Sequence, residues 1–306
     1  NYKNIEEAEL IFSPKINCLI GQNGEGKTNL LDAIHFLSFT KSAFNSIDSQ
    51  IVRHEQPYMM LKGIYESGND TEEISCALQT GKRKNFRRNG KEYKKFSEHI
   101  GLIPLIMISP SDSELIIGGS ENRRRFIDMT ISQFNPIYIA SLARYAKALQ
   151  QKNIMLKAEE EPNVEVISMY EEIMAETGEY IFKERDKFIN DFIPFFQKYY
   201  SFISGNHENV SIKYTSHGQR GPLLSTIQDN RYKERIVGYS LYGVHKDDLE
   251  MLIDSYPIKR EGSQGQNKTY LIALKLAQFE FIKKSNKSNS PILLLDDIFD
   301  KLDATR

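Results

Sequence analysis

The sequence has no tryptophan and only two cysteines, Cys18 and Cys76, among its 306 residues. Two cysteines cannot supply a four-ligand metal cluster by themselves, and nothing in their placement marks an oxidising compartment. Long apolar runs are also lacking, because the stretches at 102–108 and 292–295 fall far short of the roughly 18 residues that a membrane-spanning helix needs. The N-terminal residues lack the charged-then-apolar order of a secretory signal. We therefore expect a cytoplasmic protein with no membrane partner.

An excess of charge of either sign is missing as well. The chain has 40 Lys and Arg against 41 Asp and Glu, which gives a net charge of −1. A polycation is excluded, so any binding of nucleic acid must come from a local basic patch. Hydrophobic residues at 40% and charged residues at 26% are typical of a globular protein and exclude wholesale disorder.

The pattern along the chain predicts an α/β fold with a long helical block. A helix is expected from Thr28, and Asn89-Gly90 predicts a type I′ hairpin. Strands are expected at 5–12, 16–20 (with Cys18 packed in the core), 58–65, 73–79, 102–109, 210–214, 249–253, 256–260 and 291–296. Further helices are expected at 121–133, 136–159, 164–203, 231–237 and 264–284, with Gly178 and Pro194 bending or interrupting the third. We predict a head domain from residues 1–120 and 206–306, with residues 121–205 inserted as an α-helical arm.

Residues 21–28 read G-Q-N-G-E-G-K-T and match the phosphate-binding pattern G-x-x-x-x-G-K-[ST] in full. The glycines let successive backbone N–H groups point at phosphate oxygens, and the following helix adds its positive end. Lys27 is then expected at the β- and γ-phosphates of ATP and Thr28 at Mg²⁺. An ordinary glycine-rich turn is the alternative, but the flanking apolar run and helix favour nucleotide. The predicted nucleotide-binding residues are Gln22, Asn23, Gly24, Glu25, Gly26, Lys27, Thr28 and Asn29.

Residues 291–297 read P-I-L-L-L-D-D, a buried strand that ends in two carboxylates. Ligands of α/β sheets bind at the carboxyl ends of strands, so we expect Asp296 to hold Mg²⁺ together with Thr28. Asp297 is expected to polarise the attacking water as the general base, with Lys27 as its catalytic partner. A strand-end aspartate that caps a turn is the alternative.

Residues 262–268 read G-S-Q-G-Q-N-K and open a predicted helix. The Ser263 hydroxyl and the Gly265 N–H suit an anion at a helix N-terminus, although serine is also a good N-cap.

Taken in this order, the three motifs resemble the plan of ATP-binding-cassette ATPases. Ser263, Gln264, Gly265 and Gln266 look like the signature motif of that group, and Asp303 looks like part of its D-loop. More closely, the chain resembles the RecF family of bacterial recombination mediators. The stretches that carry this resemblance are 21–39, S-E-N-R-R-R-F-I-D (120–128), G-V-H-K-D-D-L (243–249), 262–277 and 291–303.

This resemblance implies a P-loop, ATP-binding-cassette-type ATPase head that binds DNA at gaps and junctions. Two heads would sandwich ATP as a homodimer, with the phosphate loop of one facing Ser263 of the other. RecR and RecO would be its partners in loading recombinase. Asp297 is shorter than the glutamate usual in cassette ATPases, so slow hydrolysis that DNA stimulates and that releases the dimer is expected. A transporter-coupling ATPase and a clamp that binds ATP without hydrolysing it are the alternatives.

The segment 81–95 has eight Lys and Arg and one Glu. On a hairpin these charges could follow a duplex backbone, or they could be a solvated edge. The DNA-contact candidates are Lys82, Arg83, Lys84, Arg87, Arg88 and Lys91. For Arg123, Arg124 and Arg125, ion pairs with the protein's own carboxylates are favoured over an external anion. His245, Asp247 and Asp248 could form a metal or acid–base cluster, but turn formation and ion pairing are the more common use of such residues.

Overall fold

The computed structural model describes residues 1–68, 70–286 and 289–298, and the chain divides into two compact units. Unit 1 comprises Asn1–Met107 with Lys287–Asp296, and unit 2 comprises Ile108–Asn286 with Asp297–Arg306. Both units contain helices and strands, so the predicted α/β class is confirmed.

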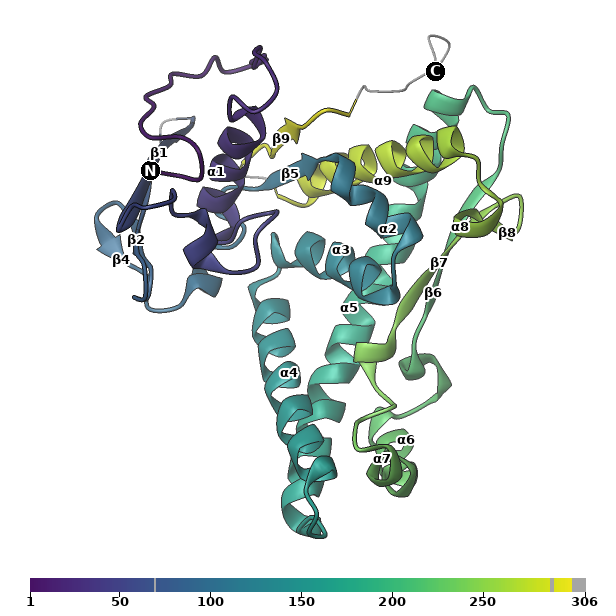
Figure 1. Ribbon diagram of the computed structural model, residues 1–306. Helices are drawn as coiled ribbons and strands as arrows, with labels where there is room; N and C mark the ends of the chain where they lie inside the picture. Colours follow the sequence, from purple (N-terminus) through teal and green to yellow (C-terminus); the bar gives the residue numbers. More distant parts are fainter. Residues whose placement is uncertain (69, 287–288, 299–306) are drawn as a thin grey trace. The chain divides into compact units, whose positions relative to one another are not determined.

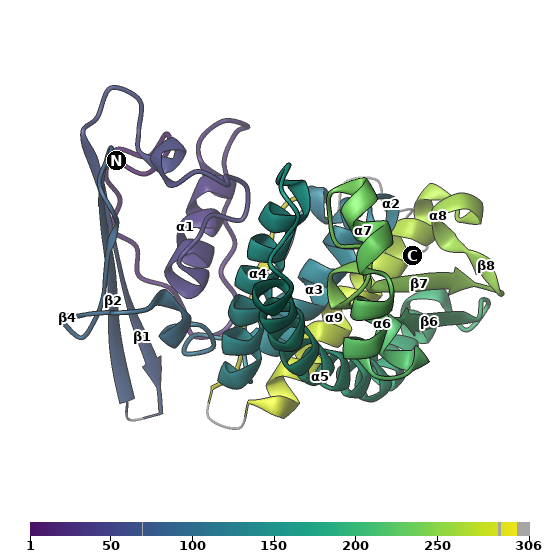
Figure 2. The same ribbon diagram turned by 90° about the horizontal axis from the view of Figure 1, so that it is seen from below.

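The described part of unit 1 contains helix α1 and two sheets, of which the larger is seen in Figure 2 and the smaller in Figure 1. The larger sheet is an antiparallel meander, and the smaller pairs one strand from each of the unit's two chain segments. The elements are α1 (Lys27–Phe39), η1 (Asp48–Ile51), β1 (Tyr58–Ser67), β2 (Asp70–Gln79), β3 (Asn85–Arg88), β4 (Lys91–Glu92), η2 (Phe96–Glu98), β5 (Leu105–Ile108) and β9 (Ile292–Leu295). Asn89 and Gly90 between β3 and β4 have φ of 48° and 77°, the positive pair that a type I′ turn requires.

The core of unit 1 joins α1 to both sheets. Alternate residues of β2 point inward, and Ile74 and Cys76 pack with Phe36 of α1 and Phe86 of β3. Leu31 of α1 lies on the other cluster, formed by the β5–β9 pair. The phosphate loop that precedes α1 is thereby anchored to a helix with hydrophobic contacts to both sheets.

Residues 5–12 and 16–20 do not form the predicted strands. Among the described residues neither segment pairs with a neighbouring strand, apart from a single bridge between Tyr2 and Ile5. Ile11, Ile16 and Ile20 are exposed, and Cys18 is exposed as well, so its predicted place in a core strand is wrong. An apolar run becomes a strand only where a partner supplies hydrogen bonds, which sequence periodicity does not report.

The described part of unit 2 is built on three long helices and a short antiparallel sheet, β6-β7-β8 (Figure 1). Its elements are η3 (Pro110–Ser113), α2 (Glu114–Ile117), α3 (Ser120–Ser132), α4 (Pro136–Lys157), α5 (Val164–Ser204), β6 (Val210–Thr215), η4 (His217–Arg220), α6 (Leu223–Asp229), α7 (Arg231–Val237), η5 (Val244–Lys246), β7 (Asp248–Ile253), β8 (Tyr256–Pro257), α8 (Ile258–Glu261) and α9 (Gln264–Ser285). The helices predicted at 121–133, 136–159 and 164–203 are confirmed as α3, α4 and α5.

Helix α5 runs unbroken through Gly178 and Pro194, so the interruption considered for these positions does not occur. A Cβ at Gly178 would lie 3.0 Å from Leu223 Cδ1 and 3.3 Å from the Tyr145 ring, so glycine permits close helix packing there. Around Pro194 an aromatic face of α5, including Phe192 and Phe196, buries against α9. This burial offsets the hydrogen bond that proline removes.

Helices α4 and α5 pack along each other, and α5 also packs on α9, β6 and α6 within unit 2 (Figure 1). The units divide the chain at Met107 and Asn286, not at residues 120 and 205. A separate arm domain over residues 121–205 stays a prediction.

Candidate nucleotide-binding site

The phosphate loop has the backbone geometry that its glycines allow. Gly24 and Gly26 have φ of 88° and 100°, in the left-handed region that side chains disfavour. A Cβ at Gly26 would also lie 2.9 Å from Asn4 Oδ1. Asn4 in turn donates from Nδ2 to the Gly24 carbonyl oxygen at 2.9 Å and accepts from Asn29. The loop is therefore held from both the N-terminal segment and α1.

The loop already binds an anionic group of its own. The Gln22 N–H donates to Glu25 Oε2 at 2.8 Å, so a carboxylate lies on the loop backbone. Among the described residues no side chain caps the first turn of α1. Lys27 donates from Nζ to the carbonyl oxygens of Gly21 and Gln22, at 2.6 Å each, and so lies folded over the loop. A loop whose backbone N–H binds a carboxylate, with a lysine against the same loop, fits the phosphates of a nucleotide.

Thr28 and Asp296 are brought together from 268 positions apart. The Thr28 hydroxyl donates to Asp296 Oδ1 at 2.8 Å, at the end of β9. Asp296 is 9% exposed. A hydroxyl and a carboxylate beside a phosphate loop are oxygen ligands of the kind that Mg²⁺ prefers, so the residues present fit the predicted metal.

Thr28 and Asp296 belong to unit 1, whereas Asp297 and Ser263 are assigned to unit 2. Asp297 is exposed with φ 49°, and Asp303 lies outside the described residues. Ser263 is the N-cap of α9 in unit 2 and forms a capping box with Gln266, while Gln264 and Gly265 are exposed in the first turn. The roles predicted for these residues stay predictions.

One of the six DNA-contact candidates is corrected by the structure. Lys84 is only 7% exposed, forms an ion pair with Asp48 at 2.9 Å and donates to the Thr40 carbonyl oxygen. Lys84 directly precedes β3 and is two residues from buried Phe86, so its side chain faces the core and its charge is not available at the surface. Arg88 is exposed but makes a bidentate pair with Glu72. Arg87 and Lys91 remain exposed on the β3–β4 hairpin, and Lys82 and Arg83 are exposed in the connection between β2 and β3.

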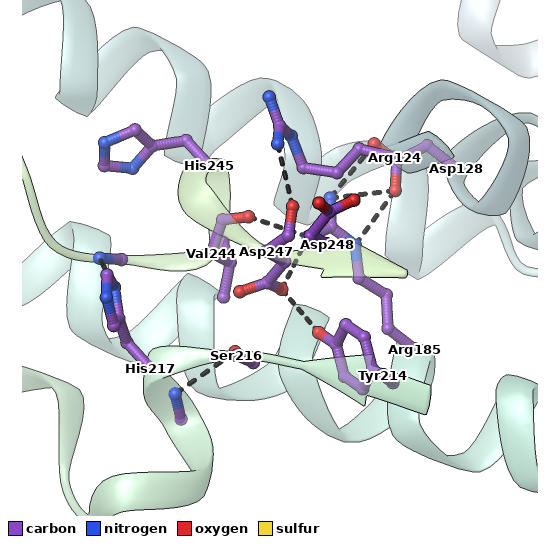
Figure 3. Close-up of polar contacts among 12 residues, drawn as sticks. Arg124, Asp128, Arg185, Tyr214, Ser216, His217, Val244, His245, Asp247 and Asp248 are labelled. Carbon is purple, nitrogen blue, oxygen red and sulfur yellow. Dashed lines mark hydrogen bonds and ion pairs between the residues drawn. The ribbon is translucent and has the colours of Figure 1, made fainter. Parts of the chain in front are cut away.

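The cluster around His245, Asp247 and Asp248 is an ion-pair network in unit 2 (Figure 3). Buried Arg185 of α5 donates to Asp247 Oδ2 at 2.7 Å and to the Val244 carbonyl oxygen at 2.8 Å. Its other nitrogens bind Asp128 of α3. The described residues contain no group of His, Cys, Asp and Glu that could hold a metal ion.

The residues next to this network are also bound to groups of the protein itself. Arg123 pairs with Asp248 at 2.6 and 3.0 Å, and Arg124 donates to the Asp247 carbonyl oxygen at 2.8 Å. His245 is bound by the Tyr145 hydroxyl at 2.7 Å, and burial lowers its pKa to about 4. The favoured prediction of internal ion pairs for Arg123 is confirmed. Sequence reasoning missed Arg185 and Asp128, because only the fold brings these residues together.

Comparison with known proteins gives consistent matches over the whole chain. A family model described as "RecF/RecN/SMC N terminal domain" matches residues 1–306. The chain is 58% identical over 307 residues to the "DNA replication and repair protein RecF" of Phocaeicola vulgatus, covering 100% of this chain and 83% of that protein. The protein of the same description from Parabacteroides distasonis is 51% identical over 306 residues, again with 100% and 83% covered.

A solved structure is also similar. The "recombination mediator protein RecF-ATP in RecFOR pathway" has a TM-score of 0.93 at 28% identity, with 100% of this chain and 85% of that chain covered. Separately, no helix in the described part of the chain is both long and apolar enough to cross a membrane.

Proposed function

We propose, from the premise that the chain belongs to the RecF/RecN/SMC N-terminal-domain family, that it is an ATP-dependent DNA-binding protein of recombinational repair and replication. Its relatives carry the description "DNA replication and repair protein RecF" over the full span of this chain. A similar solved structure is described as holding ATP, which supports ATP as the nucleotide.

The observation that carries the proposal is the hydrogen bond from Thr28 to Asp296 beside an anion-binding loop. Mg²⁺, when bound, would neutralise phosphate charge, with Thr28 and Asp296 as its protein ligands. The loop N–H groups and Lys27 then bind and orient the phosphates. Asp297 orients the attacking water and accepts its proton.

ATP binding joins two heads on DNA, and slow hydrolysis, stimulated by DNA, releases them. In this arrangement Ser263 of one copy contacts the nucleotide held by the other. The name of the pathway in the similar structure, RecFOR, supports RecR and RecO as partners at gaps and strand junctions. A transporter-coupling ATPase fits less well, since the relatives are described as DNA replication and repair proteins. The single-turnover assay described below distinguishes this ATPase from a clamp that binds ATP without hydrolysing it.

Adjacent aspartates provide the test. Asp296→Asn is expected to raise the Mg²⁺ concentration required for ATP binding at least tenfold, because it weakens a metal ligand. Asp297→Asn is expected to keep Mg²⁺-dependent binding and to lower single-turnover hydrolysis by about 100-fold or more, since it removes the general base. Calorimetry across a Mg²⁺ series and a radiolabelled single-turnover assay measure the two effects.

Lys27→Ala is the control variant, and we expect it to lose ATP binding altogether. Identical Mg²⁺ dependence in the two aspartate variants would contradict the division of roles. Tight ATP binding by the unaltered protein with no turnover in the same assay would favour the clamp.

A further inference from the structure

Gln266 is held at both ends of its side-chain amide. Its Oε1 accepts from the Ser263 N–H at 2.7 Å, and its Nε2 donates to Glu208 Oε1 at 2.9 Å. The Gln266 N–H donates back to Ser263 Oγ at 3.2 Å. The amide therefore fixes the Ser263 backbone while it is itself fixed by Glu208.

Glu208 is anchored in the other direction by helix α5. Its Oε2 accepts from the hydroxyl of Tyr200, which lies in the last two turns of α5 and is 0% exposed. The Tyr200 ring packs against Phe196 at 6.0 Å and Tyr270 of α9 at 5.8 Å between centroids. A carboxylate bound at both oxygens has little rotational freedom, and so it sets where the Gln266 amide lies.

This arrangement also orients the Ser263 hydroxyl. Because Oγ accepts the Gln266 N–H, its own hydrogen is left to donate elsewhere. Ser263 is exposed, so that donor faces outward from the first turn of α9. A hydroxyl held in this way suits a phosphate oxygen presented by a second molecule.

We propose that Glu208 is a positioning residue for Ser263, and that it transmits the position of the C-terminal end of α5 to the first turn of α9. This inference rests on the proposed function, in which Ser263 contacts ATP held by a second copy. Displacing Glu208 would leave ATP binding by the phosphate loop intact. It would weaken the ATP-dependent dimer and lower kcat without raising KM in proportion.

A charge-swap cycle tests the proposal. Gln266→Glu keeps an oxygen for the Ser263 N–H, and so it preserves the capping box that favours the helix. It also sets a carboxylate against Glu208. We expect the ATP-dependent dimer to weaken on the order of tenfold from this repulsion. Glu208→Gln alone should have a much smaller effect, because an amide can still accept from Gln266 and donate to the Tyr200 hydroxyl.

The double variant Gln266→Glu/Glu208→Gln restores a hydrogen bond between the two side chains and should recover most of the dimer. Sedimentation with and without ATP measures dimerisation, and steady-state kinetics separate kcat from KM. Glu261→Gln, a neighbouring exposed residue of α8, is the matched charge control. Far-UV circular dichroism checks folding of each variant.

Rescue by the double variant is the expected result, since a helix-capping role alone predicts no loss from Gln266→Glu. A double variant no better than Gln266→Glu, together with a normal dimer in Glu208→Ala, would overturn the role of Glu208. If Ser263→Arg still gives a full ATP-dependent dimer, the contact of Ser263 in the proposed function fails instead. The two failures are therefore distinguishable.

Discussion

His99 of unit 1 is fully buried, with Nε2 2.7 Å from the Leu37 carbonyl oxygen and Nδ1 3.0 Å from the Tyr93 hydroxyl. Burial lowers its pKa to about 4, and the hydrogen bond to Leu37 opposes that shift. The unfolded chain, with a histidine pKa of about 6.5, takes up the proton first as pH falls. The stability that His99 contributes is therefore present above pH 6.5 and is lost between about pH 6.5 and 4.

The loss from this side chain should reach about 3 kcal/mol at pH 4, because the unfolded chain binds the proton at higher pH than the folded protein does. Urea unfolding followed by far-UV circular dichroism at several pH values measures it, since the chain has no tryptophan. His99→Phe should flatten the pH dependence, whereas His54→Gln, an exposed histidine, should not. An equally steep pH dependence in His99→Phe would show that His99 is not the group responsible.

The position of a single residue could be predicted where a sequence motif defines it. It could not be predicted where the position depends on which side chains the fold buries. Thr28 and Asp296 were predicted as a pair from two motifs, and they do lie in contact. Lys84 was misplaced because a run of basic residues does not reveal which members of a ribbon face inward. Buried Lys152, which pairs with Glu171 and Glu234 from two other helices, has no sequence signature at all.

At the scale of elements, the β3–β4 hairpin is the densest basic segment of an otherwise neutral chain. With Lys84 excluded, exposed Arg87 of this hairpin and exposed Lys82 and Arg83 of the preceding β2–β3 connection are the best candidates for phosphate contact. Changing all three to Ala should weaken binding to duplexes of any sequence. The log–log salt slope should flatten by about 0.9 for each DNA phosphate that the variant no longer neutralises. ATP affinity should not change, because the three side chains lie outside the phosphate loop.

A triple variant of α5, with Ala at exposed Lys183, Lys187 and Lys198, removes the same charge and serves as control. Fluorescence anisotropy with labelled duplex over a salt series compares the two. Should only the α5 variant lose affinity and slope, the hairpin is a solvated edge and DNA lies on the long helix.

Elements with long, regular patterns were predicted well, and those that depend on neighbours were not. Helices α3, α4 and α5 followed from apolar spacing, and the turn at Asn89 followed from its chemistry. The strands predicted at 5–12 and 16–20 failed because pairing decides them. The unbroken path of α5 through Pro194 depends on aromatic packing against α9, which the local sequence does not report.

For the whole molecule, the proposed dimer has two composite ATP sites related by symmetry. Each site takes the phosphate loop from one copy and Ser263 from the other. Lys27 lies in unit 1 and Ser263 in unit 2, and variants of the two residues thus disable different halves of a composite site. Mixing the two variants therefore distinguishes a site shared between two copies from a site formed within one copy.

Lys27→Ala and Ser263→Arg should each abolish ATP hydrolysis when purified alone. When the two variants are mixed in equal amounts, only a dimer that contains one copy of each can hold an intact site. In such a dimer, the loop of the Ser263→Arg copy meets the intact Ser263 of the Lys27→Ala copy, and the second site is doubly defective. The mixture should therefore regain hydrolysis that neither variant shows alone, at no more than about half of the sites of the unaltered protein, because each mixed twofold dimer keeps one intact site of two. A mixture with no more activity than either variant alone would show that the two residues act within one copy or that no dimer forms, and sedimentation of the same mixture with ATP separates those outcomes.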